Sequence, residues 1–295
     1  MAPPPAQPPT VRHRRLSAEL KRLREAAGVS VDEAARTIGA YRTKINRIER
    51  GEWKRLRERD LRLLASLYGI PESHADALVR LAREASRRGW WASYSDVLGS
   101  GAYTSIEASA GKLRFYSGLL IPGLLQTSSY TEAVLRGWGI TDETEIRRRL
   151  EARRERQRLL DRADRPTVEV MLDQAAVNKV MGRPTTMAEQ ILHLIEACER
   201  GRATVLLLPD SAGAHAALTG QFAIMEFDSA HVSTVEPPIV FLDSAHNGLF
   251  LEEHNDVTNY MEIYKKLAST ALDSDNTARE LANLASRLTD QGDRR

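Results

Sequence analysis

A segment bounded by two glycines, Gly39 and Gly51, constrains the fold of this chain more than any other feature. Between them, Tyr41, Ile45 and Ile48 recur at helical spacing and predict one buried helix face. The other positions carry basic and polar side chains: Arg42, Thr43, Lys44, Asn46, Arg47 and Arg50. The pattern predicts a short helix that is held by its apolar side and exposes a basic side.

Two further helices are predicted before this segment. The first has apolar side chains on one face, namely Leu16, Leu20, Leu23 and Ala27. Gly28 follows, as expected of a helix C-terminal cap. Ser30 and Glu33 fit a capping box for the second helix, which ends at Gly39. Two short helices separated by a tight turn predict a helix-turn-helix.

Two more helices, near residues 61–68 and from residue 71 to 82, complete a predicted five-helix, all-α domain over residues 16–85. Residues 11–90 hold 20 Lys and Arg against 11 Asp and Glu, a net charge of +9, whereas the rest of the chain carries −7. A basic domain joined to an acidic body favours a polyanionic partner. Charge alone leaves open the alternative that Arg is simply frequent in this chain.

Residues 16–70 resemble a Cro/C1-type (Xre-family) helix-turn-helix domain, through LKRLREAAGVSVDEAARTIG and KINRIERG. The core positions of that family correspond to Leu20, Leu23, Ala34, Ile38, Ile45 and Ile48. The resemblance implies an ion pair between Arg24 and Glu49. The chain departs from the family at Val31, where Gln often contacts phosphate, and at Tyr41, where Ser or Thr often caps the recognition helix.

Such a domain places the exposed face of its recognition helix in the major groove of duplex DNA. Arg pairs bidentately with guanine and the Thr methyl group contacts thymine, so the expected base contacts are Arg42, Thr43 and Arg47. The expected phosphate contacts are Lys44, Asn46, Arg50 and Lys54. The alternative is a solvated basic helix in an ordinary bundle. One short helix reads few base pairs, so a homodimer on an inverted-repeat operator is expected.

The ends of the chain predict little structure. Residues 1–15 predict a disordered Pro-rich and basic arm, whose VRHRR stretch can also reach DNA. Residues 289–295 predict a polar tail.

The composition limits the class of protein. A single Cys excludes a disulfide framework. The sequence contains no run of 18 apolar residues, so a membrane span is not expected. A cytoplasmic, nucleoid-associated protein is therefore expected.

Residues 86–288 predict an α+β domain with a mostly antiparallel sheet. Apolar runs predict strands at residues 167–172, 203–209, 221–227, 239–244 and 248–253, with the last two in a hairpin. Helices are predicted over residues 104–117, 142–163, 173–180, 184–199 and 257–272, and around Leu281, Leu284 and Leu288. The Arg-rich helix 142–163 is expected to be solvated and salt-bridged, and the alternative is a second binding surface.

The body also resembles a known family. Residues 89–288 are similar to the C-terminal domain that accompanies Xre-type proteins in Streptomyces and other actinomycetes. The similar segments are GWW (89–91), PGLLQTSSY (122–130), RRERQ (153–157) and EQILHL (189–194). The resemblance implies a regulator encoded beside a small partner protein, in an arrangement compared to toxin–antitoxin pairs. It implies no biochemical role for the domain itself.

No enzymatic motif is found, and neither a cofactor nor a metal site is expected. The nearest approach to a metal cluster is His246, His254, Asp243 and Asp256, without an HExxH motif or a Cys in support. Cys198 falls on an apolar helix face, which favours a buried thiol. Asp173 and Gln174 follow a strand, where sites occur in open sheets, but a single carboxylate is a weak signal.

The leading interpretation is a sequence-specific, DNA-binding transcriptional regulator whose C-terminal domain senses a partner protein or a small effector. The alternative is an antitoxin-like protein that neutralises a small partner and regulates its own expression through DNA binding. An enclosed apolar pocket in the body would favour a small effector, whereas an exposed apolar groove would favour a protein. A protein partner is expected, because the resemblance includes one.

Overall fold

The computed structural model describes residues 11–53, 55–85, 90–99, 101–227, 237–243 and 248–292. The chain divides into two units, one containing the described residues up to Ser109 and the other those from Ala110 onward. In the described residues, every helix is too short or too polar to cross a membrane.

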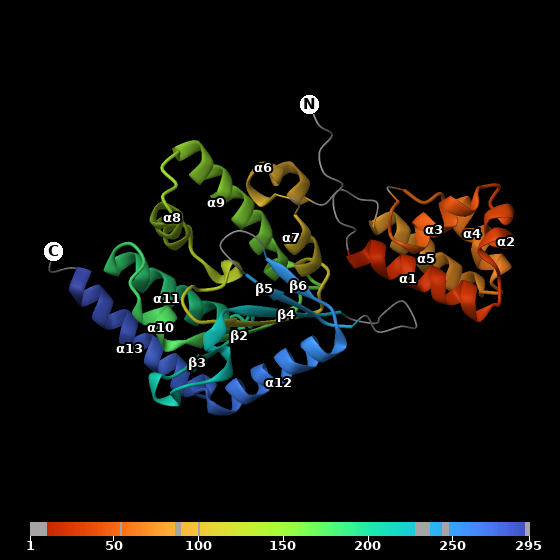
Figure 1. Cartoon of the computed structure of the whole chain (residues 1–295). Helices are drawn as coiled ribbons and strands as arrows, with labels where there is room; N and C mark the ends of the chain where they lie inside the picture. Colours follow the sequence, from red (N-terminus) through yellow and green to blue (C-terminus); the bar gives the residue numbers. More distant parts are fainter. Residues whose placement is uncertain are drawn as a thin grey trace. The chain divides into compact units, whose positions relative to one another are not determined.

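The first unit begins with the predicted all-α bundle. Its helices are α1 (Val11–Ala26), α2 (Val31–Thr37), α3 (Arg42–Glu49), α4 (Glu58–Leu67) and α5 (Glu72–Ala85) (Figure 1). Leu16, Leu20, Ile45 and Leu78 lie in its core and are at most 1% exposed. Because α1 begins at Val11, residues 11–15 of the predicted disordered arm are helical, while residues 1–10 lie outside the described residues.

The short helices α2 and α3 begin and end where the sequence pattern indicates. Ser30 is the N-cap of α2, and its hydroxyl oxygen accepts a hydrogen bond from the Glu33 backbone nitrogen at 3.1 Å. Gly39 and Gly51 have φ angles of +63° and +75°, and this left-handed conformation, which suits glycine, ends each helix. Three further short helices, η1 (Trp90–Tyr94), α6 (Ser95–Leu98) and α7 (Ala102–Glu107), also belong to the first unit.

The prediction that Tyr41 lies on the buried face of the recognition helix is wrong. Tyr41 is 86% exposed, whereas Ile45 and Ile48 are buried. The helix begins only at Arg42, and Tyr41 is its N-cap, with an extended backbone and no side-chain capping bond. A residue outside the helix does not follow the helical spacing, so its side chain points away from the core.

Arg24 of α1 is bound to Glu49 at the end of α3, the pair that the family resemblance implies. Its Nε and Nη2 donate to the two carboxylate oxygens at 2.6 and 3.0 Å. Its Nη1 donates to the carbonyl oxygen of Val29 at 3.0 Å. The two charged side chains are only 11% and 10% exposed, and the hydrogen bonds that Arg24 donates to Glu49 raise the pKa of Arg24. One guanidinium therefore joins α1, the α1–α2 connection and α3.

The second unit contains a six-stranded mixed sheet in the order β3-β2-β1-β4-β5-β6. The strands are β1 (Lys112–Ser117), β2 (Thr167–Asp173), β3 (Thr204–Leu208), β4 (Phe222–Glu226), β5 (Ile239–Leu242) and β6 (Leu249–Leu251). β1, β2 and β3 pair in parallel, and the other three pairings are antiparallel. This confirms the α+β class, and β5 and β6 pair as the predicted hairpin requires.

The prediction of a helix over residues 104–117 is wrong in its second half. α7 ends at Glu107, and residues 112–117 form β1, which lies inside the sheet between β2 and β4. Leu113 and Phe115 are buried and alternate with two basic residues, which is the period of a strand.

Long-range ion pairs explain why the basic residues of β1 lie within a sheet. Lys112 and Arg114 both contact Glu169 of β2, and Arg114 also pairs with Glu226 of β4. Arg114 is 55 residues from Glu169 and 112 residues from Glu226 in the sequence. The spacing of neighbouring residues cannot reveal ion-pair partners at such separations. The charged sequence of β1 was therefore interpreted as part of a helix.

Helices connect and cover the strands. They are α8 (Ser128–Gly137), α9 (Glu143–Gln157), α10 (Gln174–Asn178), α11 (Pro184–Glu199), α12 (His254–Thr270) and α13 (Ser274–Gly292) (Figure 1). α8 and α9 connect β1 to β2, and α10 and α11 connect β2 to β3, as parallel strands require. α12 packs against one sheet face through Val257, Tyr264 and Leu267. The predicted tail begins inside α13, which continues to Gly292.

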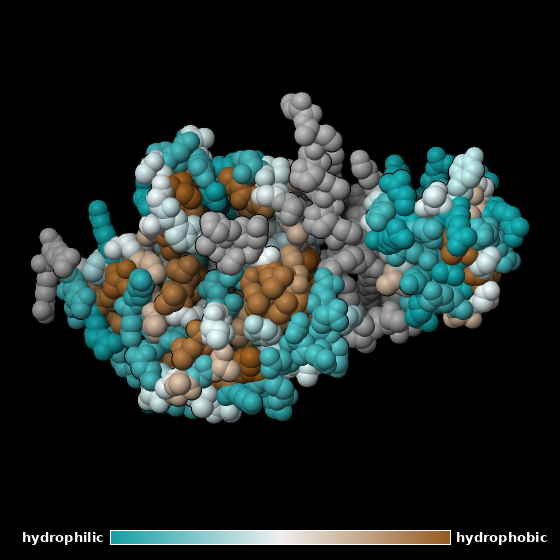
Figure 2. Space-filling model, in the orientation of Figure 1, coloured by the Kyte–Doolittle hydropathy of each residue, from teal (hydrophilic) through white to brown (hydrophobic). Residues whose placement is uncertain are grey.

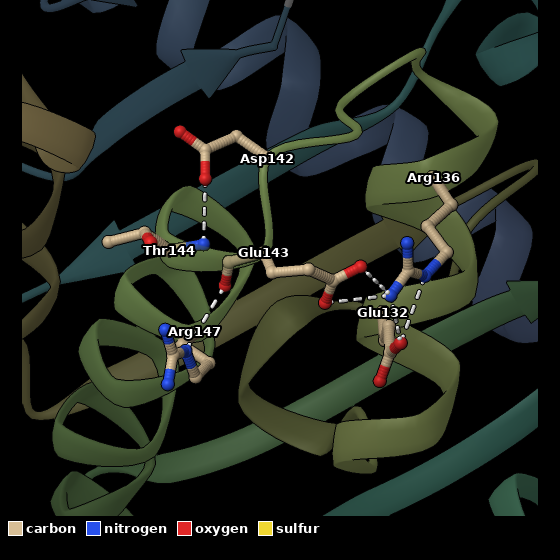
Figure 3. A network of polar contacts seen from close by, with 6 residues as sticks. All are labelled: Glu132, Arg136, Asp142, Glu143, Thr144 and Arg147. Atoms are coloured by element: carbon tan, nitrogen blue, oxygen red, sulfur yellow. Dashed lines mark hydrogen bonds and ion pairs between the residues drawn. The ribbon is translucent and has the colours of Figure 1, made fainter.

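Arg136 joins α8 to α9 (Figure 3). Its Nη2 donates to Glu132 within α8 at 2.8 Å and to both carboxylate oxygens of Glu143 at 2.8 and 3.0 Å. Asp142 caps α9 by accepting a hydrogen bond from the Thr144 backbone nitrogen at 2.8 Å. The start of the Arg-rich helix α9 is therefore held in place by its neighbour.

The outer edge of β3 is covered by the α12–α13 connection and the start of α13. The Thr277 hydroxyl oxygen accepts a hydrogen bond from the backbone nitrogen of Leu207 at 3.1 Å. The Leu272 backbone nitrogen donates to the Leu207 carbonyl oxygen at 2.9 Å. These bonds satisfy edge groups that would otherwise be available to another strand.

Replacement of Arg24 by Met is expected to destabilise the first unit by about 3–5 kcal/mol, because Glu49 would remain buried without its cation. Arg47→Met removes an exposed guanidinium from α3 and is the control, with an expected change below about 0.5 kcal/mol. Hydrogen exchange of α1 and α3 peptides, measured by mass spectrometry, gives both values. Equal protection in the two variants would contradict a structural role for the pair.

Thr277→Val keeps the shape of the side chain but leaves the Leu207 N–H without its acceptor. Loss of a buried partner costs about 1–3 kcal/mol, so the amides of β3 should exchange faster. Thr289→Val is the matched control, because among the described residues Thr289 Oγ1 bonds only to the Ala285 carbonyl oxygen of its own helix. If the amides of β3 exchange at the same rate in both variants, the hydrogen bond between Leu207 and Thr277 does not stabilise this edge.

Candidate nucleic-acid interface

α3 has two different faces. Ile45 and Ile48 are 1% and 3% exposed and belong to the core of the bundle. The exposed side chains of α3 and its C-cap are Arg42, Thr43, Arg47 and Arg50. At about 100° per residue these four side chains fall within an arc of about 140° that lies opposite the two isoleucines. The predicted base contacts therefore share one accessible surface with Arg50.

The guanidinium groups on this surface are free or weakly held. Arg47 and Arg50 make no ion pair with any described residue. Arg42 Nη1 lies 3.5 Å from Asp32 Oδ2 of α2, and both side chains are more than 60% exposed. An ion pair this exposed contributes little and gives way readily to another anion. The surface thus offers its positive charge to a ligand.

Two other predicted phosphate contacts, Lys44 and Asn46, are only half-exposed. Lys44 Nζ donates to Asp60 Oδ2 of α4 at 2.7 Å, and Asp60 is buried. Movement of Lys44 to a phosphate would leave that carboxylate unpaired, which is costly. Lys44 therefore holds α3 against α4. The remaining predicted phosphate contact, Lys54, lies outside the described residues.

Sequence reasoning missed other exposed groups close to α3 along the chain. Arg36 of α2, and Arg55 and Arg57 before α4, are exposed and form no ion pair in the described structure. Tyr41 adds an exposed aromatic ring beside Arg42. The visible face of the α1–α5 bundle is largely hydrophilic (Figure 2). The positive net charge of residues 11–90 was a signal that further arginines contribute to the surface. The exposure of Tyr41 follows from its position just before the first residue of α3.

The predicted strand-end carboxylate, Asp173, belongs to a polar cluster in the second unit. Tyr116 Oη donates to Asp173 Oδ2 at 3.4 Å, and His215 Nε2 lies 3.4 Å from the same oxygen. Asp173 Oδ1 accepts from the Ala175 backbone nitrogen at 2.9 Å and caps α10. Burial and the neighbouring carboxylate raise the pKa of Tyr116. Oδ1 of Asp173 thus caps a helix, while Oδ2 contacts two neighbouring side chains.

Among the other sequence candidates, the structure describes Gln174, Cys198, Asp243, His254 and Asp256. Gln174 Oε1 accepts a hydrogen bond from the Asp210 backbone nitrogen at 2.8 Å. Cys198 is half-buried, and burial raises the pKa of its thiol. His246 lies outside the described residues. In the part of the chain that the structure describes, including His254 and Asp256, no group of three or more His, Cys, Asp or Glu side chains could hold a metal ion.

Comparison with known proteins gives two family matches. Residues 15–78 match a helix-turn-helix domain family, and residues 101–283 match the family described as a domain of unknown function (DUF5753). No curated protein and no solved structure matches the chain.

The first match lies within the helical unit, and the second covers most of the α+β unit together with α7 of the first unit. The first covers most of α1, all of α2 to α4 and half of α5, and it supports a DNA-binding regulator. The second includes all six strands and more than half of the chain. The chain therefore belongs to the DUF5753 family and carries a helix-turn-helix domain at its N-terminal side.

Proposed function

We propose that this protein is a Cro/C1-type transcriptional regulator that recognises duplex DNA in a sequence-specific manner. The observation that carries the proposal is the exposed face of α3, where Arg42, Thr43 and Arg47 are accessible while two isoleucines fix the opposite side. Arg reads guanine in the major groove and the Thr methyl group contacts thymine. Arg50 supplies a phosphate contact beside them.

The second unit, in this proposal, senses a partner protein or a small effector and changes the DNA affinity of the first. The six-stranded domain is far larger than DNA binding alone requires, which supports a separate recognition task. Residues outside 11–90 carry a net charge of −7, so duplex DNA would repel this part of the chain. The second candidate is an antitoxin-like function, in which the bound partner is neutralised and DNA binding serves autoregulation.

Selection of duplexes from a randomised library by the purified full-length protein tests the DNA-binding proposal. Arg42→Ala and Arg47→Ala should each cost about 1–3 kcal/mol and relax the selected sequence at single base pairs. Arg50→Ala should weaken all duplexes alike, because phosphate contacts carry no sequence information. Arg80→Ala removes an exposed charge from α5 and serves as the control. A library that emerges without any sequence preference would refute the proposal.

A homodimer bound to an inverted repeat is expected. α3 has only eight residues, and two half-sites about one helical turn apart would supply the base pairs that a single copy cannot read. Light scattering after size-exclusion chromatography, with and without the selected duplex, measures the number of protein copies. One protein copy on each duplex would contradict this prediction.

A further inference from the structure

Three separate segments of the second unit meet at one place. They are residues 122–130, residues 153–157 of α9 and residues 189–194 of α11. Gln157 of α9 donates through Nε2 to the carbonyl oxygens of Gly123 and Gln126, at 3.1 and 2.7 Å. These bonds fix α9 against the irregular segment that contains η2 (Gly123–Leu125).

Gln190 of α11 binds the same segment from another direction. It is fully buried, its Nε2 donates to the Leu125 carbonyl oxygen at 2.7 Å, and its Oε1 accepts from the Thr127 backbone nitrogen at 2.7 Å. Gln126 holds the segment from within, by donating to the Ile121 carbonyl oxygen at 2.7 Å. Buried amide side chains with these bonds make the segment a rigid wall rather than a loose loop.

A cavity of about 240 Å³ lies where the three segments meet. Its apolar lining residues are Leu124, Leu125, Leu160 and Ala197. Its polar lining residues include three arginines, Arg154, Arg158 and Arg202, together with Gln157, Asp161 and His193. Burial lowers the pKa of His193, and its imidazole nitrogens can hydrogen-bond a ligand.

The charges in this cavity do not balance. Asp161 is the carboxylate among the lining residues, and it pairs with Arg202 at 2.7 Å. Arg158 pairs with Glu155 at 2.9 Å, but its side chain is 73% exposed. Arg154 donates through Nε and Nη2 to the Ser128 hydroxyl oxygen, at 3.3 and 3.2 Å, and has no carboxylate partner among the described residues. The Arg154 side chain is exposed, and among the described residues a neutral hydroxyl orients it while no carboxylate pairs with it.

We propose that this cavity binds a small organic anion, with the carboxylate or phosphate group on Arg154 and the organic part against the leucines. Guanidinium groups bind both kinds of anion through paired hydrogen bonds. The cavity is smaller than the roughly 300–1,000 Å³ that drug-sized ligands occupy, so the ligand is a compact molecule. The assignment of this anion as an effector rests on the proposed regulatory function, whereas its binding does not.

Isothermal titration calorimetry on the full-length protein tests this inference with four probes: phenyl phosphate, benzoate, inorganic phosphate and benzyl alcohol. At least one of the two organic anions should bind, and it should bind more tightly than inorganic phosphate and benzyl alcohol. The stronger of phenyl phosphate and benzoate identifies the anionic group. Absence of binding by both organic anions at millimolar concentrations would overturn the inference, as would equal affinity for benzyl alcohol.

Matched variants locate the site. Arg154→Gln should weaken binding of the organic anion about tenfold or more, as expected for loss of a charge-assisted hydrogen bond. Arg158→Gln should also weaken it, and this exposed position avoids any effect on folding. Arg147→Gln removes the same charge from an exposed position of α9 outside the cavity and should leave affinity unchanged. Equal weakening by all three would mean nonspecific attraction and would contradict the site.

The experiment is independent of DNA. A protein that binds the organic anion in this cavity but binds no duplex would retain the inference and lose the proposed regulatory function. A protein that selects duplexes but binds none of the anionic probes would do the reverse.

Discussion

The buried ion pair between Arg24 and Glu49 determines the position of α3, on which the proposed function depends. A helix of eight residues is not stable alone in water, so its conformation must come from its neighbours. The guanidinium binds the last residue of α3 and the backbone of Val29 together, and Lys44 binds Asp60 of α4. With its apolar side and its C-terminal end held in this way, α3 leaves its arginine-rich side free for a ligand.

The second unit uses two buried amides, Gln126 and Gln190, and the half-buried amide of Gln157, where the first unit uses an ion pair. Gln126, Gln157 and Gln190 satisfy the backbone of an irregular apolar segment that no helix or strand could satisfy. An unpaired buried backbone group costs free energy comparable to a lost hydrogen bond, so these amides are needed for the segment to be buried at all. The cavity beside them is therefore lined in part by a segment that hydrogen bonds hold in place.

Local periodicity was enough to predict most helices and five of the six strands, because their apolar residues recur at the helical or strand spacing over several turns or pairs. It failed at β1, whose basic residues find carboxylates on strands far away in the sequence. It also failed at Tyr41, where the helix starts one residue later than the apolar pattern suggests.

Long-range features of the candidate sites were harder to predict than the elements that carry them. The Arg24–Glu49 pair spans 25 residues and came only from a family resemblance. The pairing of Lys44 with Asp60 and the convergence of Arg154 and Arg202 at one cavity depend on tertiary packing, which no spacing in the sequence encodes. Residue types predicted the chemistry of the exposed face of α3, whereas packing decided which of its cations are free.

The salt dependence of binding to a selected duplex tests most directly whether the free arginines of the first unit neutralise DNA phosphates. Six phosphate contacts per complex would lower affinity by about a thousandfold between about 50 and 200 mM salt, because each contact releases condensed counterions. A steep linear decrease of the logarithm of affinity with the logarithm of salt concentration is the predicted result. An affinity that stays constant across this range would show that these arginines do not contact DNA.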